Sequence, residues 1–225
     1  MKDNTVMQGQ RIPTTILSMR ILPNANPALL KELGAQPGER SLGIFTTDCD
    51  DVGYVALDEA TKKAEVRVLY ARSMYGGASN ASTRLAGEFI GILAGPDPEQ
   101  VRAGLGAAAS YMENDAAFYG VDEQNSVVYF AHCISRTGSY LSAQANVPPG
   151  TAMAYLIAPP LEATVALDAA LKAAEVELAV YYGPPSETNF AGALLTGEQA
   201  ACRAACEAFA QEVARVAGAP LIEMM

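Results

Sequence analysis

The sequence predicts an α+β protein made of two ferredoxin-like domains in tandem, each an antiparallel sheet with helices packed on it. One segment occurs twice, as VALDEATKKAEV at 55–66 and VALDAALKAAEV at 165–176, with nine of twelve positions identical at a constant offset of 110. In both halves helical segments alternate with pairs of short strands. The length of 225 residues suits two domains of ordinary size, which we expect at 1–113 and 114–225.

The first half carries the signals of four strands and three helices. We expect strands at Thr15–Leu22, Ser41–Thr47, Val66–Tyr70 and Phe89–Ala94. We expect helices at Pro27–Leu33, from Asp58 to about Glu65, and from Pro98 to about Glu113. Asp58 is the expected N-cap of the second helix, and Asp97 followed by Pro98 marks the start of the third.

The second half repeats this order. The expected strands are Val127–Ile134, Ala154–Ala158, Val176–Tyr182 and Ala191–Leu195. A helix is expected at Asp168–Ala174. A last helix is expected to begin with a capping box at Thr196–Gln199 and to end near Ala217. Loops at 72–86 and 183–190 separate the strands of the second pair in each half.

Composition excludes several classes of protein. The net charge of −10 disfavours nucleic acid and anionic membranes, because both attract clustered Lys and Arg. No apolar run approaches the roughly 18 residues of a membrane span. The N-terminal segment has no apolar signal core, so the four Cys are expected to be reduced thiols of a cytoplasmic protein.

Several motifs together resemble one family. They are LDEATKKAEVRVLYARSMYGG (57–77), SRTGSYLS (135–142), APPLEAT (158–164), ALDAALKAAEVEL (166–178), PPSETNF (184–190) and GALLTGEQAACRAAC (192–206). In these the chain is similar to the tandem-domain shell proteins of ethanolamine-utilisation microcompartments, which carry two BMC domains. The resemblance covers nearly the whole chain except residues 1–10 and 220–225.

This resemblance implies a structural protein and not an enzyme, with no cofactor, no metal and no catalytic residue. Each half would be a circularly permuted BMC domain. Three chains would form a flat pseudohexamer that tiles with other shell proteins into a compartment wall in the cytoplasm. The trimer would have a gated central pore for metabolite or cofactor passage, and three small pores that bind ethanolamine.

An acidic cluster supplies the candidate ligand site. Asp48, Asp50 and Asp51 follow an apolar strand, where they form either a polar turn or a site for a cation. Glu162 occupies nearly the matching place in the second copy. The resemblance implies ethanolamine contacts from this cluster and the second half, namely Asp50, Asp51, Phe118, Glu162 and Thr188.

The loop at 72–86 is the other candidate. A connection of this length is usually functional or disordered, and its glycines allow unusual backbone angles. It is either a mobile surface loop or, as the resemblance implies, part of a gate at the trimer axis. The gate residues expected from both copies are Arg72, Tyr75, Gly76, Gly77, Pro185 and Ser186.

Other chemically suggestive residues have simpler explanations. His132 lies in an apolar strand without ligands at zinc-like spacing, so a hydrogen-bonded structural role is favoured over metal binding. Cys202 and Cys206, four positions apart on a helix, are expected to pack as small apolar residues against a sheet. The segment 135–140 is expected to be a polar turn, because no second His exists for a Ser-His-Asp relay.

Two alternatives to a pore-forming shell protein stay open at this level. One is a cytosolic, trimeric, ferredoxin-like enzyme or sensor that binds a small amine and uses the same carboxylates as acid and base. The other is a structural wall with an inert pore, which predicts no ligand binding. Flat hexagonal arrays in electron micrographs would identify a shell protein.

Overall fold

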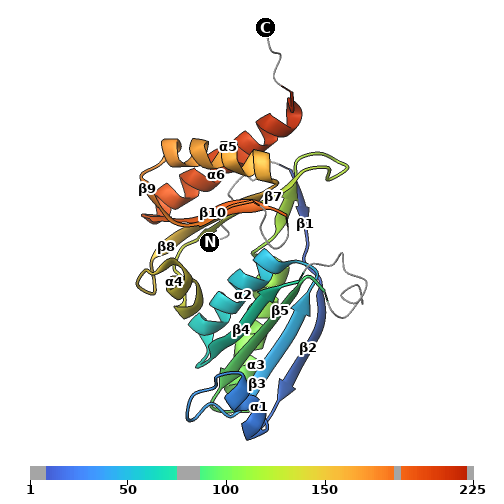
Figure 1. Ribbon diagram of the computed structural model, residues 1–225, viewed down its shortest axis with the longest axis vertical. Helices are drawn as coiled ribbons and strands as arrows, with labels where there is room; N and C mark the ends of the chain where they lie inside the picture. The colour runs from blue at the N-terminus through green and yellow to red at the C-terminus, as the bar shows by residue number, and fades with distance from the viewer. Residues whose placement is uncertain (1–8, 75–86, 185–188, 222–225) are drawn as a thin grey trace. The chain divides into compact units, whose positions relative to one another are not determined.

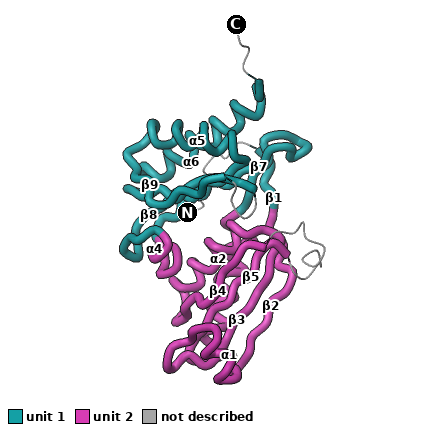
Figure 2. Tube along the Cα trace, in the orientation of Figure 1, with its two compact units in different colours: residues 1–12, 117–136, 145–225 teal, residues 13–116, 137–144 magenta. Residues whose placement is uncertain are grey.

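The computed structural model describes residues 9–74, 87–184 and 189–221, and these form two compact units. Unit 2 consists of residues 13–116 and 137–144 (Figure 2). Unit 1 consists of 117–136, the described part of 145–225, and the N-terminal strand β1. No helix among the described residues is long and apolar enough to cross a membrane.

Unit 2 is a four-stranded antiparallel sheet with three helices (Figure 1). Its elements are β2 (Ile16–Leu22), α1 (Pro27–Glu32), β3 (Ser41–Thr47), α2 (Asp50–Lys63), β4 (Arg67–Ser73), β5 (Phe89–Gly95) and α3 (Pro98–Asn114). The strand order is β2-β3-β5-β4, and every neighbouring pair is antiparallel. A further helix, α4 (Ser139–Ala145), groups with this unit although it comes later in the chain.

Unit 1 repeats this plan with two extra strands. It contains β1 (Gln10–Ile12), β6 (Phe118–Gly120), β7 (Val128–Ile134), β8 (Ala152–Ala158), α5 (Pro160–Ala173), β9 (Val176–Tyr182), β10 (Ala191–Gly197) and α6 (Gln199–Gly218). The order β7-β8-β10-β9 matches β2-β3-β5-β4, and β1 and β6 extend the sheet beyond β7. The helices α2 and α5 both have 14 residues, and both strand pairs after them carry a register shift.

The topology itself shows the circular permutation. When β2 is taken last, unit 2 reads β3-α2-β4-β5-α3-β2, which is the βαββαβ order of ferredoxin-like proteins. Unit 1 reads the same way when β7 is taken last. The prediction of two α+β modules with antiparallel sheets and packed helices is therefore confirmed.

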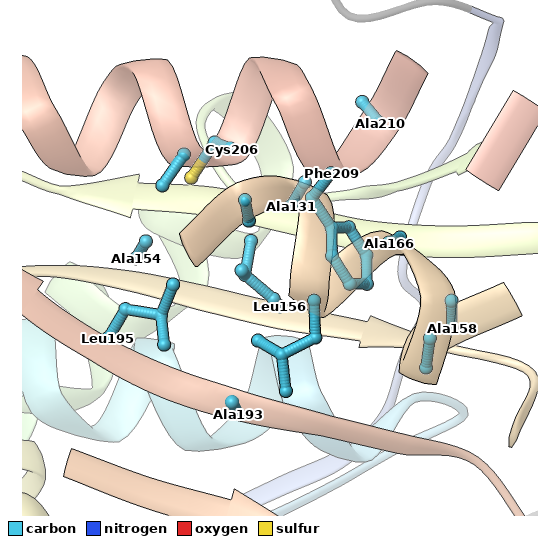
Figure 3. Close-up of a cluster of buried hydrophobic side chains, with 14 of the residues drawn as sticks. Ala131, Ala154, Leu156, Ala158, Ala166, Ala193, Leu195, Cys206, Phe209 and Ala210 are labelled. Atoms are coloured by element: carbon cyan, nitrogen blue, oxygen red, sulfur yellow. The ribbon is translucent and has the colours of Figure 1, made fainter. Parts of the chain in front are cut away.

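The core of unit 1 is unusually rich in small side chains. Figure 3 shows Phe209 of α6 and Leu156 of β8 among alanines of the sheet and of α5. Figure 1 shows α5 and α6 running together along one face of this sheet.

Cys202 and Cys206 are fully buried in the same cluster, which confirms their packing role. Burial raises the pKa of Cys202 to about 11, the neighbouring Cys133 adding to the effect, so this thiol is protonated at neutral pH.

Three of the expected helix starts are wrong. The helix α2 begins at Asp50 and α5 at Pro160, eight residues before Asp58 and Asp168 in each case. Asp58 and Asp168 lie inside the helices instead, so the preference of Asp for the N-cap did not locate either start. The expected capping box at Thr196 does not form, since the N-cap of α6 is Glu198 and its side chain makes no capping bond.

Three short elements were not expected. The strands β1 and β6 pair with each other across more than a hundred residues of chain, as in the register pair Arg11 and Tyr119. The helix α4 occupies part of the segment expected to be a polar turn. The strands β1 and β6 have only 3 residues each, and the 7 residues of α4 make about two helical turns, so neither length gives a clear periodic signal.

Replacing the N-cap of α3 tests the local helix signals. The carboxylate of Asp97 accepts hydrogen bonds from the amides of Glu99 and Gln100, both at 2.9 Å. Asp97→Ala should lower the free energy of unfolding by about 1 kcal/mol in urea titrations, because these amides lose their acceptor. Glu198→Ala is the matched control at the N-cap of α6, and it should change that free energy by less than about 0.5 kcal/mol. An equal loss in both variants would contradict a capping role for the Asp97 side chain.

Candidate functional site

Two of the expected ligand residues begin the helix α2. Asp50 and Asp51 are its first two residues, and both side chains are buried, with exposed fractions of 9% and 5%. Carboxylates are favoured at this end of a helix because its unpaired backbone amides carry partial positive charge. The two acidic groups are thus held at a fixed place by the helix that follows β3.

A hydrogen-bond network fixes the orientation of Asp50. Its Oδ2 accepts a bond of 2.6 Å from the hydroxyl of Ser73, at the end of β4. The Ser73 hydroxyl also lies 2.8 Å from the hydroxyl of Tyr54, which accepts the Ser73 amide at 2.9 Å. Neither Tyr54 nor Ser73 was expected at the site from the sequence. Tyr54 stands four positions after Asp50, which places both on one face of α2 and is the one signal that could have found it.

The residues just before α2 have structural contacts of their own. The Oδ1 of Asp48 accepts the amide of Thr15 at 2.7 Å, which ties together the ends of β2 and β3. Burial raises the pKa of the Cys49 thiol, and the charge of Asp51 raises it further. Cys49 is therefore a neutral thiol beside the carboxylates. Of the three Asp in the cluster, Asp50 and Asp51 are the buried ones.

The second copy presents an acidic residue at the same end of its helix. Glu162 is the third residue of α5, with a half-buried side chain, where α2 has the buried Val52. The match to Asp51 is thus displaced by one residue along the helix. Phe118 lies in β6, and its ring stacks on Phe130 at a centroid distance of 5.3 Å and contacts Phe190 at 6.2 Å.

The structure distributes the predicted ligand residues over both units. Asp50 and Asp51 belong to unit 2, whereas Phe118 and Glu162 belong to unit 1. Thr188 lies outside the described residues. The ethanolamine site therefore stays a prediction.

Of the expected gate residues, only Arg72 falls in the described part of the chain. It is an exposed residue of β4 and pairs in register with Ile90 of β5. The loop expected at 72–86 therefore starts too early in the prediction, because β4 continues to Ser73. Tyr75, Gly76, Gly77, Pro185 and Ser186 lie outside the described residues, so the gate also stays a prediction.

Other titratable residues form no metal site in the described ranges. His132 lies in β7, and its ring stacks on Phe130 at 5.5 Å. Within residues 9–74, 87–184 and 189–221, no group of three His, Cys, Asp or Glu side chains has an arrangement suited to a metal ion.

Comparison with known proteins agrees with these features. A family model described as the BMC domain matches residues 41–122 and 159–225. The chain is 58% identical to the bacterial microcompartment shell protein EutL of Clostridium perfringens over 215 residues, covering 96% of this chain and 99% of that protein. Its identity to EutL of Escherichia coli K12 is 50% over 210 residues, covering 93% and 96%.

Solved structures give the same answer. The crystal structure of the ethanolamine utilization protein EutL from Leptotrichia buccalis superposes with a TM-score of 0.92 at 59% identity, covering 96% of this chain and all of that one. The trimeric microcompartment shell protein PduB has a TM-score of 0.75 at 19% identity, with 91% and 90% covered, which shows a shared fold alone.

Similarity of this extent confirms the resemblance found in the sequence motifs. It also confirms a structural protein rather than an enzyme, because the relatives are shell proteins. The chain belongs to the bacterial microcompartment shell proteins with two BMC domains, the family of EutL.

Proposed function

We propose that this protein is a shell subunit of an ethanolamine-utilisation microcompartment and binds ethanolamine through the acidic helix starts of its two modules. The name of the Leptotrichia buccalis relative, an ethanolamine utilization protein, supports the compartment. The observation that supports ethanolamine binding is that both equivalent helices, α2 and α5, begin with partly or fully buried carboxylates.

The chemistry of these residues suits a small protonated amine. Ethanolamine carries an ammonium group with three N–H donors and a hydroxyl that donates or accepts. Ionised carboxylates such as Asp50, Asp51 and Glu162 accept charge-assisted hydrogen bonds, which are stronger than neutral ones. Thr188 adds a hydroxyl for the other end of the ligand, and the ring of Phe118 adds an apolar wall.

The assembly is a trimer that forms a pseudohexamer and tiles with other shell proteins. Each chain carries two similar modules, so three chains would place six of them around one axis. The central pore passes metabolites or cofactors, and its gate is formed by Arg72, Tyr75, Gly76 and Gly77 with Pro185 and Ser186. If ethanolamine binds one state of the gate more tightly, it shifts the gate by that difference in affinity.

Titration calorimetry with ethanolamine hydrochloride tests the ligand. We expect weak binding to the wild-type protein and at least about tenfold weaker binding to Glu162→Gln, because a hydrogen bond to a charged group contributes about 1.5–3 kcal/mol. Glu175→Gln, an exposed position just after α5, is the matched control and should bind as the wild type does. Unchanged binding in Glu162→Gln would remove that residue from the site, and no binding to the wild type would favour an inert pore.

A further inference from the structure

Three polar side chains of unit 2 form one chain of hydrogen bonds. An ionised carboxylate only accepts, so the single hydroxyl hydrogen of Ser73 is directed to Oδ2 of Asp50, at 2.6 Å. Tyr54 is therefore the donor in the 2.8 Å bond between its hydroxyl and that of Ser73. The Tyr54 oxygen in turn accepts the Ser73 amide at 2.9 Å. We call these three residues, Tyr54, Ser73 and Asp50, the Asp50 relay.

The Asp50 relay holds both oxygens of one carboxylate. Oδ1 of Asp50 accepts the amide of Asp51 at 2.9 Å, and Oδ2 accepts the Ser73 hydroxyl. The second bond has the length of a charge-assisted O–H···O⁻ bond, and such bonds favour the ionised form. A carboxylate has about four acceptor positions, so two bonds do not exhaust its capacity to accept from a ligand. The relay thus stabilises a negative charge beside a second buried carboxylate, that of Asp51.

Aromatic neighbours from two elements hold the ring of Tyr54. The ring lies edge-on to Phe89 of β5 at a centroid distance of 4.9 Å, and it stacks on Tyr140 of α4 at 6.3 Å with 12° between the planes. The helix α4 comes from the connection between β7 and β8 but groups with unit 2 (Figure 2). Asp58, one turn after Tyr54 on α2, accepts two amides of this segment and fixes it there. The docking of α4 therefore places Tyr140 on the ring that begins the relay.

The internal repeat separates the Asp50 relay from the scaffold that carries it. At the offset of 110, its three members correspond to Pro160, Thr164 and Gly183 of the second copy. Pro and Gly have no polar side chain, and the Thr164 hydroxyl donates to the carbonyl of Pro160 within α5. All three members differ together, although the adjoining segments 55–66 and 165–176 share nine of twelve residues. The relay is thus a feature of one module and not a requirement of the fold.

We propose that Ser73, Tyr54 and Tyr140 are positioning residues for ethanolamine binding that act through Asp50. Ser73 orients the carboxylate, Tyr54 orients the Ser73 hydroxyl, and Tyr140 holds the Tyr54 ring. A carboxylate that is already oriented loses less conformational freedom when the ligand binds. The inference rests on the proposed ethanolamine site and assigns the support of that site to one of the two modules.

Titration calorimetry with ethanolamine hydrochloride tests the relay at Ser73. Ser73→Ala should bind at least about tenfold more weakly than the wild type, because Asp50 loses a charge-assisted donor. Ser73→Thr keeps the hydroxyl and should bind within about threefold of the wild type. Both variants should retain the circular dichroism spectrum of the wild type. Rescue by Thr separates the hydroxyl from a general effect on packing.

Two further variants test the order of the relay. Tyr54→Phe removes only a hydroxyl and should weaken binding about three- to tenfold. Tyr70→Phe is the matched control, because Tyr70 is an exposed residue of the same strand as Ser73, and it should bind as the wild type does. Tyr140→Leu should weaken binding on its own but add nothing to Tyr54→Phe, because it acts through the Tyr54 hydroxyl.

The possible outcomes distinguish the relay from the ligand. Wild-type binding that Ser73→Ala and Tyr54→Phe leave unchanged would overturn the relay and leave the ethanolamine site standing. A loss in Ser73→Ala that Ser73→Thr does not restore would assign the effect to packing and also overturn the relay. Full additivity of Tyr140→Leu with Tyr54→Phe would remove Tyr140 from it. A wild-type protein that binds no ethanolamine would overturn the site and this inference together.

Discussion

Phe209→Ala is expected to lower the free energy of unfolding by about 3–5 kcal/mol, among the largest losses from a single substitution in this chain. The ring of Phe209 is fully buried at the centre of the unit 1 core (Figure 3). Truncation removes its apolar contacts and leaves a cavity. The neighbours that could move into that cavity are mostly alanines, such as Ala166 and Ala193, and their methyl groups are too short to fill it.

Urea unfolding followed by circular dichroism measures this effect, with all variants at one protein concentration because assembly adds to apparent stability. Phe209→Leu keeps much of the volume and should lose about 1–2 kcal/mol. Leu221→Ala, at a position that is 86% exposed, should stay within about 0.5 kcal/mol of the wild type. A loss below about 1.5 kcal/mol in Phe209→Ala would mean that the core closes around the gap.

Asp58→Ala is expected to lower the free energy of unfolding by about 2–4 kcal/mol. The carboxylate is 1% exposed and accepts the amides of Gly138 and Leu141. Without it, two buried amides lose a charged acceptor, and each such loss costs about 1–3 kcal/mol. Hydrogen exchange should report the same event locally, as faster exchange of the Gly138 and Leu141 amides.

Lys62→Ala separates the ion pair from the capping of α4. The ammonium of Lys62 lies 3.5 Å from Asp58 and is partly exposed, so its removal should cost less than about 1 kcal/mol and leave amide exchange in α4 slow. If Lys62→Ala were as destabilising as Asp58→Ala, the charge pair and not the capping of α4 would explain the stabilising effect of Asp58.

Local features of the sequence were sufficient for much of the fold. The strands Ser41–Thr47 and Val176–Tyr182 agree with the expectation at both ends, the first because it is a short apolar run and the second because it is an alternating stretch. The N-cap at Asp97 was also correct, because a capping bond joins residues two or three apart. The internal repeat required no structure at all, and it predicted two modules that share one strand order.

The candidate site was only partly accessible from sequence. The acidic residues before and at the start of α2 were visible in the sequence as a cluster, but their different roles were not. Asp48 accepts a hydrogen bond that links the ends of two strands, whereas Asp50 and Asp51 are buried. The Ser73 bond to Asp50 spans 23 residues, and no local pattern encodes such a pairing.

What the sequence determined by itself was the duplication, the α+β class, the family and most strands, because each depends on near neighbours or on similarity between segments. The tertiary structure decided the role of the repeated Asp. Asp58 and Asp168 stand in nearly identical segments, yet one is buried beneath α4 and the other faces solvent. The environment of a side chain depends on what folds against it from distant parts of the chain, and a pattern shared by both copies carries no information on that difference.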